Sequence, residues 1–194
     1  PIAGRAAYYE ALLALDEDDE ARARQWCAEA FAKAADTEEG FEARLLLIEL
    51  QHRAGPSHDF MAALEQMSRS GDLPRRSHAK LAKRIGDLAR NERAYPQAIA
   101  RYQEAVELSP SLASEGTYRI ASCYEEAGDL EEAAAWYQRV PHAPWRVRGL
   151  LAAAKLLQRQ DRIKEAEGIY ERLAAEPIPE AKVVREWLVA LRHD

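Results

Sequence analysis

The residues best able to do chemistry in this sequence begin with an acidic run at residues 16–20. Its carboxylates could bind calcium, but an EF-hand loop needs Gly at its sixth position and Glu at its twelfth, where this sequence has Ala21 and Cys27. Carboxylates at the start of a helix cap free amide groups and interact favourably with the helix dipole. We therefore interpret the acidic run as the beginning of a helix.

The cysteines and histidines are spaced too widely to form a recognisable catalytic or metal site. Cys27 and Cys123 lie 96 positions apart in separate helical patterns, and no histidine adjoins Cys123 to activate its thiol. The sequence contains no Gly-rich phosphate loop, nucleophile elbow, His-Glu-x-x-His or Cys-x-x-Cys motif. We expect no catalytic residues, no metal site and no cofactor. The histidines fall mostly near predicted helix ends, as capping or solvent-facing residues: His52, His58, His78, His142 and His193.

The composition is that of a globular protein and excludes several classes of function. The 194 residues are 47% hydrophobic with a formal net charge of -6, and acidic and basic residues are interspersed. This balance argues against nucleic-acid binding, and no stretch approaches the ~20 apolar residues of a membrane span. The sequence leaves the compartment open between periplasm and cytoplasm, and it also leaves the oligomeric state open.

A series of helices must position any functional residue in this chain. Short breaks rich in Gly, Pro, Asp, Asn and Ser separate segments rich in Ala, Leu, Glu, Arg and Gln, which are strong helix formers. Short connections force consecutive helices into antiparallel pairs. We predict five pairs and an unpaired last helix: 5–15 with 19–35, 38–54 with 58–69, 74–92 with 95–108, 112–127 with 130–140, 144–159 with 163–174, then 179–192.

An alanine followed four residues later by a tyrosine recurs three times along the chain. The steps between successive copies are 35 and 33 residues, and four residues correspond to one helical turn. A period near 34 residues indicates stacked helical hairpins that bury their apolar faces against neighbouring hairpins. We expect the alanines at close helix crossings and the tyrosines in the core: Ala98 and Tyr102, Ala133 and Tyr137, Ala166 and Tyr170.

Residues 74–174 resemble tetratricopeptide repeats. The fourth pair matches that family's pattern of small and large positions best, with Ile120, Ala121, Tyr124 and Gly128 followed by the alanine and tyrosine. The fifth pair has Asp161 where the family prefers Gly. The resemblance implies an all-α, right-handed superhelical solenoid forming one domain over 1–194, with degenerate repeats at 1–73, clear repeats at 74–178, and a capping helix or truncated repeat at 179–194.

The resemblance also implies that the first helix of each pair lines a concave surface that binds protein partners. Chaperone-binding members use a Lys followed four residues later by an Asn, but here Asp87 follows Lys83, so that activity is not carried over. Spaced cations around a tyrosine suit an extended, acidic peptide or protein segment, although a merely solvated charged face is the alternative. The candidate partner-binding residues are Lys80, Lys83, Arg84, Arg90, Tyr118, Arg148 and Lys155.

We hypothesise from these features that the chain is a non-catalytic scaffold for protein–protein interaction, within a bacterial envelope or secretion assembly. One alternative is that it is the repeat region of a larger exporter, regulator or enzyme whose activity lies outside this chain. A further alternative, a hydrolase or transferase, would need His, Asp or Cys residues clustered on one face.

Overall fold

The computed structural model describes residues 2–53, 55–70 and 73–191. The chain divides into two compact units, Pro1–Leu88 (unit 1) and Ala89–Asp194 (unit 2), and the boundary falls inside one helix. The expectation of one domain over 1–194, with its repeat boundaries, stays a prediction.

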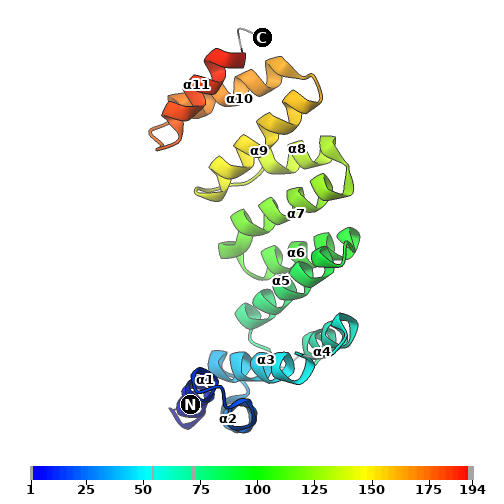
Figure 1. Ribbon diagram of the computed structural model, residues 1–194, viewed down its shortest axis with the longest axis vertical. Coiled ribbons are helices and arrows are strands. Elements are labelled where there is room, and N and C mark those ends of the chain that lie inside the picture. The colour runs from blue at the N-terminus through cyan, green and yellow to red at the C-terminus, as the bar shows by residue number, and fades with distance from the viewer. Residues whose placement is uncertain (1, 54, 71–72, 192–194) are drawn as a thin grey trace. The chain divides into compact units, whose positions relative to one another are not determined.

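All eleven predicted helices are present, and the described residues contain no strand (Figure 1). Residues 54 and 192, which end two of the predicted helices, lie outside the described residues. Unit 1 contains α1 (Ile2–Asp16), α2 (Glu20–Ala34), α3 (Glu38–His52), α4 (Ser57–Arg69) and most of α5 (Arg75–Asn91). Unit 2 contains the end of α5, α6 (Tyr95–Leu108), the 3-10 turn η1 (Pro110–Leu112), α7 (Ala113–Ala127), α8 (Leu130–Gln138), α9 (Trp145–Arg159), α10 (Ile163–Ala175) and α11 (Ala181–Leu191).

Local sequence signals explain where several helices begin and end. The Asp19 carboxylate accepts a hydrogen bond from the Arg22 amide at 3.0 Å, so the acidic run starts α2 as predicted. Gly128 ends α7 with a φ of 93°, a left-handed conformation that glycine adopts without steric cost. Asp161 takes the same region, with a φ of 60°, between α9 and α10. The aspartate therefore replaces the family's glycine without changing the type of turn.

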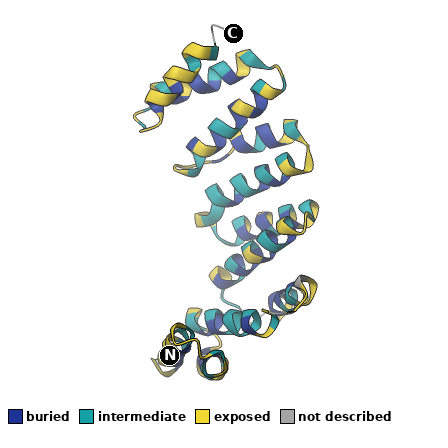
Figure 2. Cartoon of the chain, in the orientation of Figure 1, coloured by how far each residue is buried: buried dark blue, intermediate teal, exposed yellow. Residues whose placement is uncertain are grey.

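The repeated alanines and tyrosines form the contacts between helices, as the sequence predicts. Ala98, Ala133 and Ala166 are fully buried, and their tyrosines are at most 2% exposed. The hydroxyl of Tyr137 donates to Glu125 and that of Tyr170 to Gln158, each at 2.8 Å and each twelve residues back in the preceding helix. The repeat thus supplies a buried ring together with a polar partner for its hydroxyl. Figure 2 shows the resulting buried stripes on the helices.

The first helices of successive pairs also contact one another directly, α1 with α3 in unit 1 and α7 with α9 in unit 2. The last helix, α11, packs on α10. Its residues Ala181 and Val184 are buried, and Leu188 and Leu191 pack against the core of unit 2, so α11 is an amphipathic helix. Within the described residues, no helix is long and apolar enough to span a bilayer.

Candidate partner-binding surface

The predicted partner-binding residues of unit 1 lie on α5, where carboxylates of α3 neutralise two of them. The Lys80 ammonium lies 2.5 Å from a Glu38 carboxylate oxygen and 2.8 Å from one of Glu42. Hydrogen bonds from these two glutamates raise the pKa of Lys80, and the bond to Lys80 lowers the pKa of Glu38. The Lys80 cation is therefore part of an ion-pair network within unit 1.

Arg84 is paired in the same way, with its guanidinium 2.7 Å from a Glu49 oxygen. Lys83 lies 3.7 Å from Asp87 on the same helix, so the residue that replaces the family's asparagine forms an ion pair with the lysine. Arg84 and Glu49 also border a pocket of about 620 Å³ in unit 1. Apolar side chains at this pocket are Leu15, Leu46, Leu50 and Phe60, and further polar ones include Asp18, His52 and Arg53.

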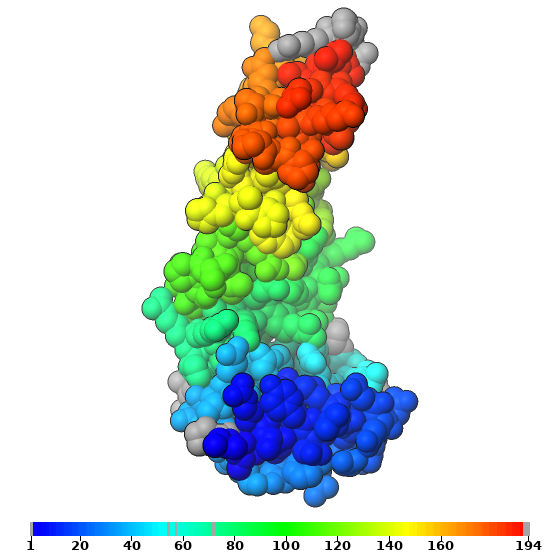
Figure 3. Space-filling model, turned by 90° about the vertical axis from the view of Figure 1, so that its left-hand side faces the viewer, coloured from blue at the N-terminus to red at the C-terminus, as the bar shows by residue number. Residues whose placement is uncertain are grey.

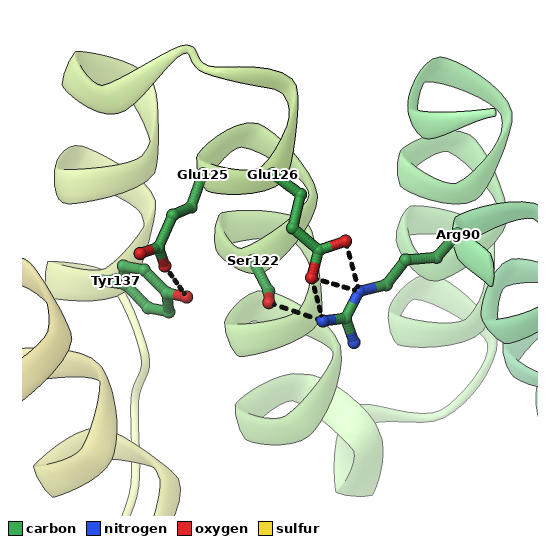
Figure 4. A network of polar contacts seen from close by, with 5 residues as sticks. All are labelled: Arg90, Ser122, Glu125, Glu126 and Tyr137. Atoms are coloured by element: carbon green, nitrogen blue, oxygen red, sulfur yellow. Dashed lines mark hydrogen bonds and ion pairs between the residues drawn. The ribbon is translucent and has the colours of Figure 1, made fainter. Parts of the chain in front are cut away.

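Arg90, at the start of unit 2, joins α5 to α7 (Figure 4). Its Nε donates to both oxygens of Glu126, at 3.1 and 3.2 Å, and its Nη2 donates to the Ser122 hydroxyl at 3.0 Å and to Glu126. The hydrogen bonds to Glu126 raise the pKa of Arg90. This bidentate geometry fixes the guanidinium, so Arg90 acts as a structural link between two helices.

The remaining predicted residues of unit 2 surround exposed or half-buried aromatic rings. The ring of Tyr118 on α7 lies 5.1 Å from Trp145 on α9 and 5.1 Å from the buried Tyr137. The Arg148 guanidinium lies 5.1 Å from the centre of the Trp145 ring, within the range of a cation–π interaction. Burial raises the pKa of Tyr137, so its hydroxyl stays protonated at neutral pH and can donate to Glu125.

A second cation–aromatic pair lies farther along α9. The Lys155 ammonium is 5.3 Å from the centre of the Trp187 ring on α11, and Trp187 meets Tyr170 edge-on at 6.2 Å. These three residues border a pocket of about 280 Å³ whose other lining residues are Gln158, Ala190 and Leu191. Trp187 is 39% exposed, which is high for so large an apolar ring.

Together these side chains form a surface that we call the aromatic face: Tyr118, Trp145, Arg148, Lys155 and Trp187. No carboxylate of the described residues lies within 4.0 Å of the Arg148 or Lys155 cation. The aromatic face therefore presents ring area together with two cations that form no ion pair with the described residues. Such a surface is suited to binding, and the described residues include no group of three His, Cys, Asp or Glu side chains that could hold a metal ion.

The structure thus separates the predicted residues into two groups. Tyr118, Arg148 and Lys155 belong to the aromatic face, whereas the cations on α5 engage carboxylates. Trp145 and Trp187 were not among the candidate residues predicted from the sequence. A signal that could have found Trp187 is its place on the last helix, which lies beside Lys155 of α9.

Comparison with known proteins identifies the repeat and the fold. Residues 83–145 match the tetratricopeptide repeat family. No curated protein matches the sequence. Among solved structures, a MamA protein is 14% identical with a TM-score of 0.62, covering 87% of this chain and 88% of its own. A tetratricopeptide repeat protein from Parabacteroides merdae is 15% identical with a TM-score of 0.62, covering 100% of this chain and 73% of its own.

A longer solved protein also contains this fold. The signal transduction ATPase with a tetratricopeptide repeat sensor from Pyrococcus horikoshii is 13% identical with a TM-score of 0.66, over 96% of this chain but only 32% of its own length. At these levels of identity, the solved structures show the helical-repeat fold alone.

Proposed function

Because residues 83–145 belong to the tetratricopeptide repeat family, whose members generally mediate protein–protein interactions, we propose that this chain is a non-catalytic scaffold that binds a peptide segment of a protein partner. We place the binding site on the aromatic face of unit 2. The observation that carries this proposal is the pairing of the Lys155 and Arg148 cations with tryptophan rings rather than with carboxylates.

The chemistry of the aromatic face favours an acidic segment that also carries apolar side chains. Tyr and Trp rings offer large contact areas at a small entropic cost, and they are the residues that most often dominate binding energy at interfaces. Arg148 and Lys155 can each form a charge-assisted hydrogen bond with a carboxylate of the ligand. The equivalent cations of unit 1 would first have to leave the carboxylates of α3.

Peptide selection followed by point substitution tests this site. A phage-displayed library of random peptides would be panned against the 194-residue chain, and the affinities of enriched peptides would be measured by fluorescence polarisation. We expect enrichment of Asp and Glu beside apolar residues, and a loss of affinity of roughly tenfold or more for Trp187→Ala or Lys155→Glu, the size typical of a central interface residue. Because ion pairs at a surface are screened, affinity should also fall with added salt.

Arg84→Ala is the matched control, since it removes a first-helix cation that is already paired with Glu49. This variant should bind selected peptides within about twofold of the unmodified chain, as expected for a residue outside the interface. Equal losses for Arg84→Ala and Lys155→Glu, or failure to enrich any peptide, would contradict the assignment to unit 2.

The repeat region of a larger protein is the second candidate, and it is motivated by the Pyrococcus horikoshii protein, in which the similar repeats are a sensor in a longer chain. An immunoblot of the source cells would distinguish it by the mass of the native polypeptide, because this chain alone has a mass of 21.8 kDa. A role in a bacterial envelope or secretion assembly stays a prediction, which fractionation of the same cells would test.

A further inference from the structure

The first helix of the chain is apolar on almost all sides. Only Arg5, Glu10 and Asp16 of its fifteen residues are charged. One face, formed by Gly4, Ala7, Ala11 and Ala14, is buried within unit 1. A helix that is apolar all round is normally buried all round, so the opposite face of α1 requires an explanation.

That opposite face is a regular stripe of exposed apolar residues. Ile2, Tyr9 and Leu13 are 86%, 52% and 52% exposed, and the exposed Ala6 lies between them. We call these four residues the α1 stripe. Their spacing of four, three and four residues is that of the a and d positions of a coiled coil, with Ile2 and Tyr9 at d and Ala6 and Leu13 at a. Figure 3 shows the N-terminal residues, in dark blue, at the surface of unit 1.

The charged residues beside the stripe identify the kind of helix that fits it. In this register Arg5 takes a g position and Glu10 the following e position. In a parallel two-stranded coiled coil, a g residue of one helix faces the e residue five positions on in the other. A second α1 in parallel would therefore bring Arg5 of each copy beside Glu10 of the other. Both side chains are accessible, at 61% and 42% exposed, although Arg5 also contacts Glu39 and Glu10 contacts Arg22 within the chain.

We propose that the α1 stripe is a self-association surface, on which α1 of a second copy of this chain packs in parallel and in register. The stripe is complementary to itself in both apolar pattern and flanking charge. This interface is separate from the aromatic face and does not depend on a peptide ligand. A stripe of about three helical turns buries less than the ~1,200 Å² that marks the low end of stable interfaces, so the dimer is weak and reversible.

Sedimentation velocity of the 194-residue chain over about a hundredfold range of concentration measures this association, because a dimer is populated by mass action. We expect a reversible shift from monomer to dimer. Leu13→Lys places two like charges in the apolar seam and should weaken dimerisation at least about tenfold. Val189→Lys on α11 is the matched control, since Val189 is similarly exposed at 57% but lies outside the stripe.

A chain that stays monomeric at every concentration would overturn the proposal, as would a dimer that is equally sensitive to both substitutions. Thermal unfolding monitored by circular dichroism would accompany each measurement. Both sites are exposed, so both variants should melt within a few degrees of the unmodified chain, consistent with the small effects usual for surface substitutions. If the Leu13→Lys variant fails to fold, the Leu13→Cys variant still tests the interface, because its side chain is smaller and uncharged.

Cross-linking and charge exchange test the parallel register. Leu13→Cys should form an intermolecular disulfide on mild oxidation, because in-register parallel helices place the two copies of this a position together, and the native Cys27 and Cys123 are buried. Arg5→Glu should weaken the dimer, and the double variant with Glu10→Arg should restore it. A dimer that neither cross-links at position 13 nor responds to charge exchange would overturn the parallel arrangement.

Discussion

Lys80 and Arg84 on α5 direct their cations at carboxylates of α3, whereas Arg148 and Lys155 on α9 place theirs over tryptophan rings. All four residues occupy first helices of repeats, and all four carry a positive charge on a long, flexible side chain. The cations of unit 1 thus link two helices within the unit. The cations of Arg148 and Lys155 instead lie over rings and form no ion pair with the described residues.

The difference arises from residues one repeat away in the sequence. Glu42 precedes Lys80 by 38 positions and Glu49 precedes Arg84 by 35, close to the repeat length. The cations of Lys80 and Arg84 therefore meet the equivalent surface of the preceding first helix, α3. The Lys155 cation instead lies over Trp187 on α11, and the Arg148 cation lies over Trp145 on its own helix. The state of a first-helix cation is thus set by its neighbours as much as by its own side chain.

Removing the ring beneath the aromatic face should have the largest effect on stability. Tyr137 is 2% exposed and supports Tyr118, so Tyr137→Ala should lower the free energy of unfolding by roughly 3 to 5 kcal/mol, as deletion of a core aromatic side chain does. Tyr137→Phe keeps the ring and loses the hydroxyl with its hydrogen bond to Glu125, a cost of about 1 kcal/mol. Urea denaturation measures both values. Equal stability of the alanine variant and the unmodified chain would show that the repeat register is wrong.

Replacing one lysine in each unit should have a smaller effect on stability, and the effect should differ between Lys80 and Lys155. Lys80→Met leaves Glu38 and Glu42 close together without their cation, and it should cost about 0.5 to 1 kcal/mol of stability at low salt, as for other exposed ion pairs. Lys155→Met removes no ion pair with the described residues, so we expect a smaller loss of stability but weaker binding of selected peptides. A double-mutant cycle with Glu38→Gln measures the coupling in unit 1. The opposite order of stability losses would contradict the contrast between the units.

The sequence was sufficient to predict the helices and the repeated core, because both depend on local patterns. The period of Ala133 and Tyr137 predicts their burial, and the 3/4 spacing of Ala181, Val184 and Leu188 predicts the packing of α11. The states of Lys80, Arg84 and Lys155 depend instead on residues more than thirty positions away, which no short motif encodes. Lys80 and Lys155 have the same side chain, and only the neighbouring first helix distinguishes an ion pair from an available charge.

Acidification should give the smallest and most specific distinction between the units. The hydrogen bond from Lys80 holds the pKa of Glu38 below its ordinary value in the folded chain. A carboxyl group whose pKa is lowered by folding stabilises the fold above its unfolded pKa and loses that contribution as the pH falls through its folded pKa. Glu38 therefore adds stability at neutral pH that declines below the ordinary glutamate pKa of about 4.3.

Urea denaturation at a series of pH values from neutral to acidic tests this linkage in three proteins. The unmodified chain should lose stability on acidification more steeply than Lys80→Met, because in that variant the pKa of Glu38 returns toward its ordinary value. Lys155→Met should keep the slope of the unmodified chain, since the Lys155 cation lies over the Trp187 ring and pairs with no carboxylate of the described residues. Glu176, whose pKa is lowered by Arg146, contributes to the slope of all three proteins and cancels from the comparison. Indistinguishable slopes for the two lysine variants would mean that Lys80 does not hold Glu38 in solution, and the cations of the two units would then be equally available to a ligand.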